Sequence, residues 1–89
     1  MTTIYMRHPV EEYSRWRQAF DAHEDTRRHY GLQVLKVQRN IDHPLEVIIV
    51  LEAADVTLAR EFAGSDELRM AMIRAGVAGR PEVWFAEDA

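Results

Sequence analysis

The chain has 89 residues, of which 47% are hydrophobic and 29% charged, and its formal net charge is −4. This length corresponds to one domain, and the composition is typical of a soluble globular protein. The eleven basic residues are scattered among fifteen acidic ones, so no basic surface indicates nucleic-acid binding. The absence of cysteine excludes disulfide bonds and thiolate metal sites.

Neither a signal peptide nor a membrane-spanning helix is predicted. The first eight residues contain no long apolar run, and no segment approaches the roughly 18 apolar residues of a membrane span. We therefore expect a cytoplasmic protein with no membrane or nucleic-acid partner.

The first third of the chain predicts a strand followed by a helix. Thr2–His8 alternates in polarity as a strand does, and Pro9 ends it because proline cannot donate a ladder hydrogen bond. Val10–Tyr30 has helical periodicity, and Gly31 is a natural helix terminator. One stripe of this helix holds Tyr13, Trp16, Phe20, His23, Arg27 and Tyr30.

Two further strands follow and are predicted to form a hairpin. Leu32–Arg39 is the more polar strand and suits a sheet edge, and residues 40–44 form the turn. Leu45–Ala53 is apolar at both parities from Val47 to Leu51, so it must be covered on both faces.

The last third predicts an interrupted helix and a final strand. Asp55 is a candidate N-cap, Gly64 interrupts the helix, and Ser65 can cap its restart. Residues 76–81 form a loop, and Glu82–Glu87 is the fourth strand.

The order strand-helix-strand-strand-helix-strand predicts a single α+β domain, residues 1–89, with a ferredoxin-like fold. Right-handed crossovers place the first and third strands centrally in a four-stranded antiparallel sheet, with both helices on one face. The other face is predicted to carry Tyr5, Leu35, Val37, Ile48, Val50 and Trp84. Because exposed apolar patches of this kind mark interfaces, we expect a homodimer that packs sheet against sheet. The alternative is a monomer in which these residues are ordinary strand formers.

The chain also resembles the dimeric α/β-barrel superfamily, which includes the antibiotic-biosynthesis monooxygenases. It looks most like a group of short bacterial proteins that are mostly uncharacterised and sometimes called cyclase-like. The resemblance rests on His8, Tyr13–Trp16, Phe20–His23, Arg28, Gly31, Ala59–Phe62, Ser65–Arg69, Ala75–Val77 and Pro81–Glu82.

The resemblance implies a fold, and more loosely an activity. The oxygenases of the superfamily use no metal or prosthetic group, and they hold electron-rich aromatic substrates between sheet and helices. The haem-degrading members use an Asn on the first strand and a His on the second helix, and this chain has neither. The resemblance therefore implies no cofactor and no haem degradation.

His8 is the candidate catalytic residue. It shares the face of the first strand that is predicted to meet the helices, where a neutral imidazole could exchange a proton with a phenol-like substrate. The alternative is a histidine at a strand end that is hydrogen-bonded to a loop.

His23 and Arg27 are candidate ligand-binding residues because both fall on the apolar stripe of the first helix. A buried arginine needs a partner, and Glu24 or Glu52 could provide it. In one interpretation the two residues anchor an anionic or hydroxylated ligand. In the other, the arginine makes an ion pair with such a glutamate at the rim of a frayed helix end, and its stem covers apolar surface.

Tyr13 and Trp16 are predicted to form the wall of a ligand site, in a row with Phe20, although such a row also suits a core. The polar turn at residues 40–43 is explained by turn chemistry, so no metal site is expected.

Together these patterns predict a small-molecule-binding protein. It could be a cofactor-independent monooxygenase or cyclase that acts on an aromatic or polyketide-like compound. The alternative is a non-catalytic dimeric module, either ligand-binding or stress-associated.

Overall fold

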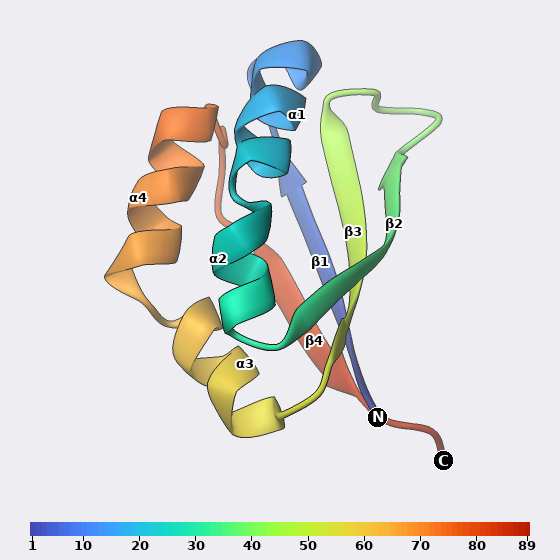
Figure 1. The fold of residues 1–89 in the computed structure, drawn as a ribbon. Coiled ribbons are helices and arrows are strands. Elements are labelled where there is room, and N and C mark those ends of the chain that lie inside the picture. The colour runs from blue at the N-terminus through green and yellow to red at the C-terminus, as the bar shows by residue number, and fades with distance from the viewer.

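The protein consists of two layers, a four-stranded antiparallel sheet and a layer of helices on one of its faces (Figure 1). The computed structural model describes residues 1–89. In chain order the elements are β1 (Thr2–Pro9), α1 (Tyr13–Ala22), α2 (Glu24–His29), β2 (Leu32–Arg39), β3 (Glu46–Ala53), α3 (Val56–Ala63), α4 (Asp66–Ala75) and β4 (Glu82–Ala86). The strand order β2-β3-β1-β4 is the predicted ferredoxin-like topology. None of the helices has both the length and the apolarity needed to cross a membrane.

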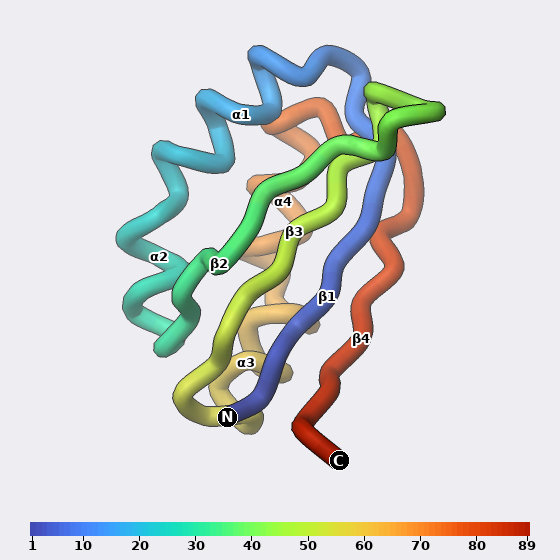
Figure 2. The backbone as a smooth tube through the Cα atoms, turned by 90° about the vertical axis from the view of Figure 1, so that its right-hand side faces the viewer, coloured from blue at the N-terminus to red at the C-terminus, as the bar shows by residue number.

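Strand β3 lies in the middle of the sheet, as its apolar sequence predicts (Figure 2). Val47, Ile49 and Leu51 are at most 3% exposed and form the centre of the core beneath the helices. Their neighbours along the strand, Ile48 and Val50, are half-buried on the opposite face. The prediction that the two parities of this strand serve different surfaces is therefore confirmed.

The helix-free face of the sheet carries a group of apolar side chains at its centre, as predicted. Tyr5, Leu35 and Trp84 on this face remain 43–48% exposed. Tyr5 lies between Val50 and Trp84 in the register of the three strands.

Val37 does not lie on that open face, so this part of the prediction is wrong. The pairing of β2 with β3 shifts between Val34 and Lys36, which makes Leu35 an extra residue. A bulge of this kind inverts the parity of every residue that follows it. Val37 therefore pairs with Ile49 and packs on the core beneath the helices.

The helix predicted over Val10–Tyr30 is in fact two helices. α1 starts only at Tyr13, because Val10 is held in an extended segment that pairs with Val77. α1 ends at His23, whose backbone leaves helical geometry at φ −94° and ψ 9°. The helix layer can therefore bend over the sheet instead of crossing it as one rod.

The predicted interruption between α3 and α4 is confirmed. The carboxylate of Asp55 caps α3 by accepting a hydrogen bond from the amide of Thr57 at 2.8 Å. The Ser65 hydroxyl accepts a hydrogen bond from the amide of Leu68 at 3.1 Å and donates one to the carbonyl of Phe62 at 2.7 Å. Ser65 therefore both closes α3 and opens α4.

Replacing Ser65 with alanine should destabilise the protein. The substitution removes both hydrogen bonds at the α3–α4 junction, and loss of a helix cap typically lowers the free energy of unfolding by about 1 kcal/mol. Urea denaturation measures this change. Ser14→Ala is the control, because Ser14 is exposed in α1 and caps no helix. Equal stability of the two variants would contradict the assigned role of Ser65.

Candidate ligand-binding site

A small cavity lies between the sheet and the helix layer. Its volume is about 60 Å³, which leaves room for roughly four water molecules or a ligand group of that size. Eleven of its fourteen lining residues are hydrophobic. The other three are His8, His23 and Arg27, all of which the sequence had singled out. An apolar cavity with a few convergent polar groups is the usual form of a small-molecule site.

Four of the five predicted site residues line this cavity, namely His8, Trp16, His23 and Arg27. Tyr13 does not line it. The Tyr13 ring is half-buried against the core, and the guanidinium of Arg39 lies 4.3 Å from its centre.

His8 is almost completely buried, with 2% of its surface exposed. Its strand position points it toward the helices, where its ring meets the Trp16 ring edge-on at 5.7 Å. Nδ1 lies 3.4 Å from the carbonyl oxygen of Pro9, at the long end of the hydrogen-bond range. Burial lowers the pKa of His8 below its ordinary value of 6.5, so the ring is neutral at pH 7 and is able to accept a proton.

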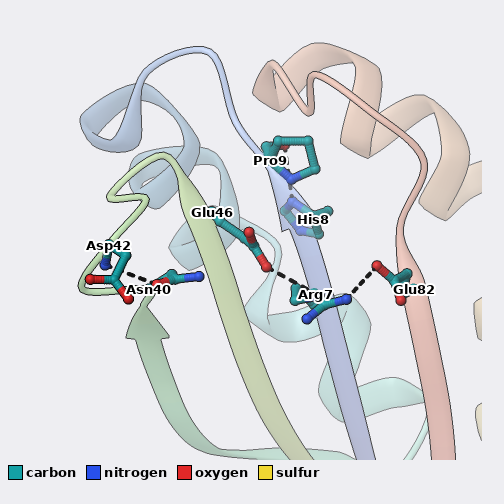
Figure 3. Close-up of polar contacts among 7 residues, drawn as sticks. All are labelled: Arg7, His8, Pro9, Asn40, Asp42, Glu46 and Glu82. Carbon is teal, nitrogen blue, oxygen red and sulfur yellow. Dashed lines mark hydrogen bonds and ion pairs between the residues drawn. The ribbon is translucent and has the colours of Figure 1, made fainter.

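His8 also borders a second, polar hollow of about 280 Å³ at the end of the sheet. Arg7 dominates this region, with ion pairs to Glu46 at 3.1 Å and Glu82 at 2.7 Å (Figure 3). Asn40 and Arg80 complete its polar wall. His8 is therefore the residue that borders both the apolar cavity and this polar hollow.

Arg27 is buried without an ionic partner. Its side chain is 6% exposed, and Nε is shielded from solvent with no hydrogen-bond acceptor. The expected partner, Glu24 or Glu52, is not there: Glu24 pairs with Arg28 at 3.4 Å, and Glu52 makes no ion pair. Burial lowers the pKa of Arg27, but a guanidinium stays protonated in proteins, so the positive charge remains.

The aromatic wall of the cavity supports Arg27. The Arg27 guanidinium lies 3.8 Å from the centre of the Phe20 ring, and Phe20 in turn stacks on Trp16 at 4.8 Å. The negative face of an aromatic ring attracts a cation, which partly offsets the lost hydration of the guanidinium. The sequence placed Phe20 in this row of rings without assigning it to the ligand site. In the structure Phe20 packs against the core and also lines the cavity.

His23 lies at the junction of α1 and α2, half-buried beside Phe62. Burial and the positive charge of Arg27 lower the pKa of His23, and Glu67 opposes them. His23 is therefore also neutral at pH 7. Arg27 is the one charged group that lines the cavity.

The sequence did not identify the part of the wall that comes from α4. Leu68, Met72 and Ala75 line the cavity, but their pattern is that of an ordinary apolar helix stripe. Met6 could have been inferred, because it shares the face of β1 with His8. No three His, Asp or Glu side chains lie close enough together to hold a metal ion.

Similarity to solved structures places the chain in one fold class. A provisionally named antibiotic biosynthesis monooxygenase from Bordetella bronchiseptica matches with a TM-score of 0.81 and 13% identity, over 99% of this chain and 96% of that one. One with the same provisional name from Caulobacter crescentus has a TM-score of 0.75 and 13% identity, over 99% and 89%. A conserved protein from Methanosarcina mazei has a TM-score of 0.74 and 13% identity, over 99% and 92%.

The chain therefore has the fold of these monooxygenase-like proteins, as its sequence pattern predicted. At such identities the shared feature is the fold and not the activity. No protein-family profile matches the chain, and no curated protein is a detectable sequence relative.

Stability should depend on pH through His8. Its pKa is lowered on folding, so the unfolded chain binds the proton more readily. The stabilisation is complete above about pH 6.5 and is lost as the pH falls below that value. We expect the free energy of unfolding to drop between pH 7 and pH 5.5, and to drop less in His8→Gln, as measured by urea denaturation. His43→Gln, in the exposed hairpin, is the control and should keep the full drop in the free energy of unfolding. Identical pH profiles of stability for His8→Gln and His43→Gln would contradict the assignment to His8.

Proposed function

We propose that the protein is a homodimer that binds a small planar organic ligand in the cavity beneath α1, α2 and α4. One observation carries this proposal, namely the convergence of His8, His23 and Arg27 on a single apolar cavity. Surfaces of this kind orient a ligand by its polar groups and hold it by its apolar ones.

The reaction that fits the site is a cofactor-independent oxygenation of an electron-rich aromatic ring. His8 takes the proton from a phenolic hydroxyl, which raises the electron density of the ring. The ring then reduces molecular oxygen: one oxygen atom becomes a carbonyl of a quinone and the other leaves as water. The proton on His8 and the hydrogen lost from the oxidised ring carbon both end in that water, so His8 is neutral again after the reaction. The names given to similar structures agree with this chemistry.

The second candidate is a binding module without catalysis, and the size of the cavity favours it. About 60 Å³ is less than the 150 Å³ of an engineered cavity that holds benzene, so even a single-ring aromatic substrate would require the helices to move. A small ligand needs no such rearrangement.

Substitution of His8 distinguishes the two candidates. Phenol, catechol and 1-naphthol are offered as probes, with binding followed by calorimetry and turnover by an oxygen electrode. An oxygenase should consume oxygen, and His8→Gln should lower kcat by about 100-fold or more while binding persists, because a general base contributes on the order of 10² to 10⁴. His43→Gln should behave as the unsubstituted protein. If the unsubstituted protein and His8→Gln both bind a probe but neither consumes oxygen, the oxygenase is rejected and the binding module remains. If no probe binds, both candidate functions are rejected.

The homodimer is proposed from the open face of the sheet. Tyr5, Leu35 and Trp84 are exposed there, beside the half-buried Ile48 and Val50. A patch of apolar side chains on a central sheet is unfavourable in water and is normally covered by another surface. Two copies packed face to face would bury it on both.

Val50→Asp should convert the dimer into a monomer or unfold the chain, because the interface would enclose a carboxylate without a partner. Light scattering at about 10 μM measures the mass. Leu58→Asp is the control, since Leu58 is exposed in α3 on the opposite layer, and this variant should stay dimeric. A monomeric unsubstituted protein at that concentration would refute the dimer.

A further inference from the structure

Arg27 is a charged side chain that lines an apolar cavity and makes no ion pair. Asp21 and Glu24 border an outer hollow together with it and act on its charge only at longer range. Placing an ion in such surroundings is strongly unfavourable unless a partner provides hydrogen bonds and opposite charge. The nearest acidic residues are already engaged: Asp21 pairs with Arg17 at 3.1 Å, and Glu24 pairs with Arg28 at 3.4 Å. The chain itself therefore lacks a partner for this guanidinium.

The surroundings of Arg27 leave its donors free for a ligand. Phe20 covers one flat face of the guanidinium at 3.8 Å, and contact with a ring face occupies none of the N–H groups, which lie in the guanidinium plane. Nε is buried without an acceptor, and Arg27 lines the cavity. The planar arrangement of N–H donors matches the two oxygens of a carboxylate.

The rest of the cavity selects among anions. His8 and His23 are neutral at pH 7, so Arg27 supplies the only positive charge that lines it. A phosphate dianion would need more donors than one guanidinium in a wall where eleven of fourteen residues are hydrophobic. The volume of about 60 Å³ admits a carboxylate and a few carbon atoms.

We propose that Arg27 binds the carboxylate of the natural ligand, so that the ligand class is a small monocarboxylic acid. This inference rests on the proposed function, because it requires that the cavity be a ligand site. It adds the chemical group by which the site recognises its ligand, and it places that group against Arg27 and Phe20.

The test compares acids with amides of the same shape. Propanoate and propanamide, and butanoate and butanamide, are titrated into ¹⁵N-labelled protein at pH 7 and followed by NMR. We expect each acid to bind at least tenfold more tightly than its amide, since a buried charge-assisted pair has no equivalent in the amide complex. The Nε–H resonance of Arg27 should shift with the acids alone.

Arg27→Met removes the charge and keeps an apolar side chain of similar length, so the variant should fold and should bind each acid no better than its amide. Arg28→Met is the matched control: it removes the same charge at the adjacent position, which is exposed and outside the cavity. This control should keep the tenfold preference. The NMR spectrum and the Tm of each variant report that it is folded.

Three results would overturn the inference. Equal affinity of acids and amides for the unsubstituted protein would reject carboxylate recognition and leave the binding function in place. Preserved selectivity in Arg27→Met, or an unmoved Nε–H resonance with saturating acid, would show that another group recognises the carboxylate. No binding of any of the four probes, of phenols or of larger aromatic compounds would reject the ligand site itself, and the inference with it.

Discussion

The apolar character of both faces of strand β3 is the constraint on which the rest of the molecule depends. Val47, Ile49 and Leu51 are buried beneath the helices, and Ile48 and Val50 lie half-buried on the opposite face, which the proposed second copy would cover. A strand of this kind is stable only in the middle of a sheet, which brings β1 alongside it. The register between the two strands then places His8 opposite Val47, the most deeply buried position of β3. The burial of the imidazole therefore follows from the packing of the strand.

The helix layer leaves a cavity because it is broken and because its inner surface includes small residues. The break at His23 and the junction at Ser65 produce four short helices in place of two long ones. Ala19, Ala71 and Ala75 then line the space between α1, α4 and the sheet, where larger side chains would fill it. Protein interiors are otherwise closely packed, so a void at this position is specific to these residues. Longer side chains, such as those of Arg27 and Met72, complete the wall of the cavity.

Periodicity in the sequence was sufficient for the fold and for the three polar residues that line the cavity. Two-residue and 3.6-residue repeats identified the strands and the inward stripe of the first helix, and the element order then left one topology. The bulge at Leu35 could not be predicted, because a single extra residue does not change the local alternation of polarity enough to be recognised. The missing ion pair of Arg27 could not be predicted for another reason. Glu24 is close in sequence to several arginines, and only the structure shows that it pairs with Arg28. The contribution of α4 to the cavity wall depends on how that helix packs against α1 and the sheet, which its apolar stripe alone does not reveal.

Arg27 links stability to recognition through one physical effect. In the apolar cavity the effective dielectric constant is low, so a charge without a partner destabilises the fold, and a charge with one is held strongly. The stacking on Phe20 offsets part of this desolvation penalty. A cation over an aromatic face is attracted by about 0.5–2 kcal/mol, whereas burial of an ion costs several kcal/mol. The charges of Glu24 and Asp21 offset a further part, and the carboxylate that we propose as ligand would offset more. In the proposed site the same guanidinium would give the cavity its preference for a negative ligand. Together with burial it also lowers the pKa of His23, which keeps a second positive charge from competing.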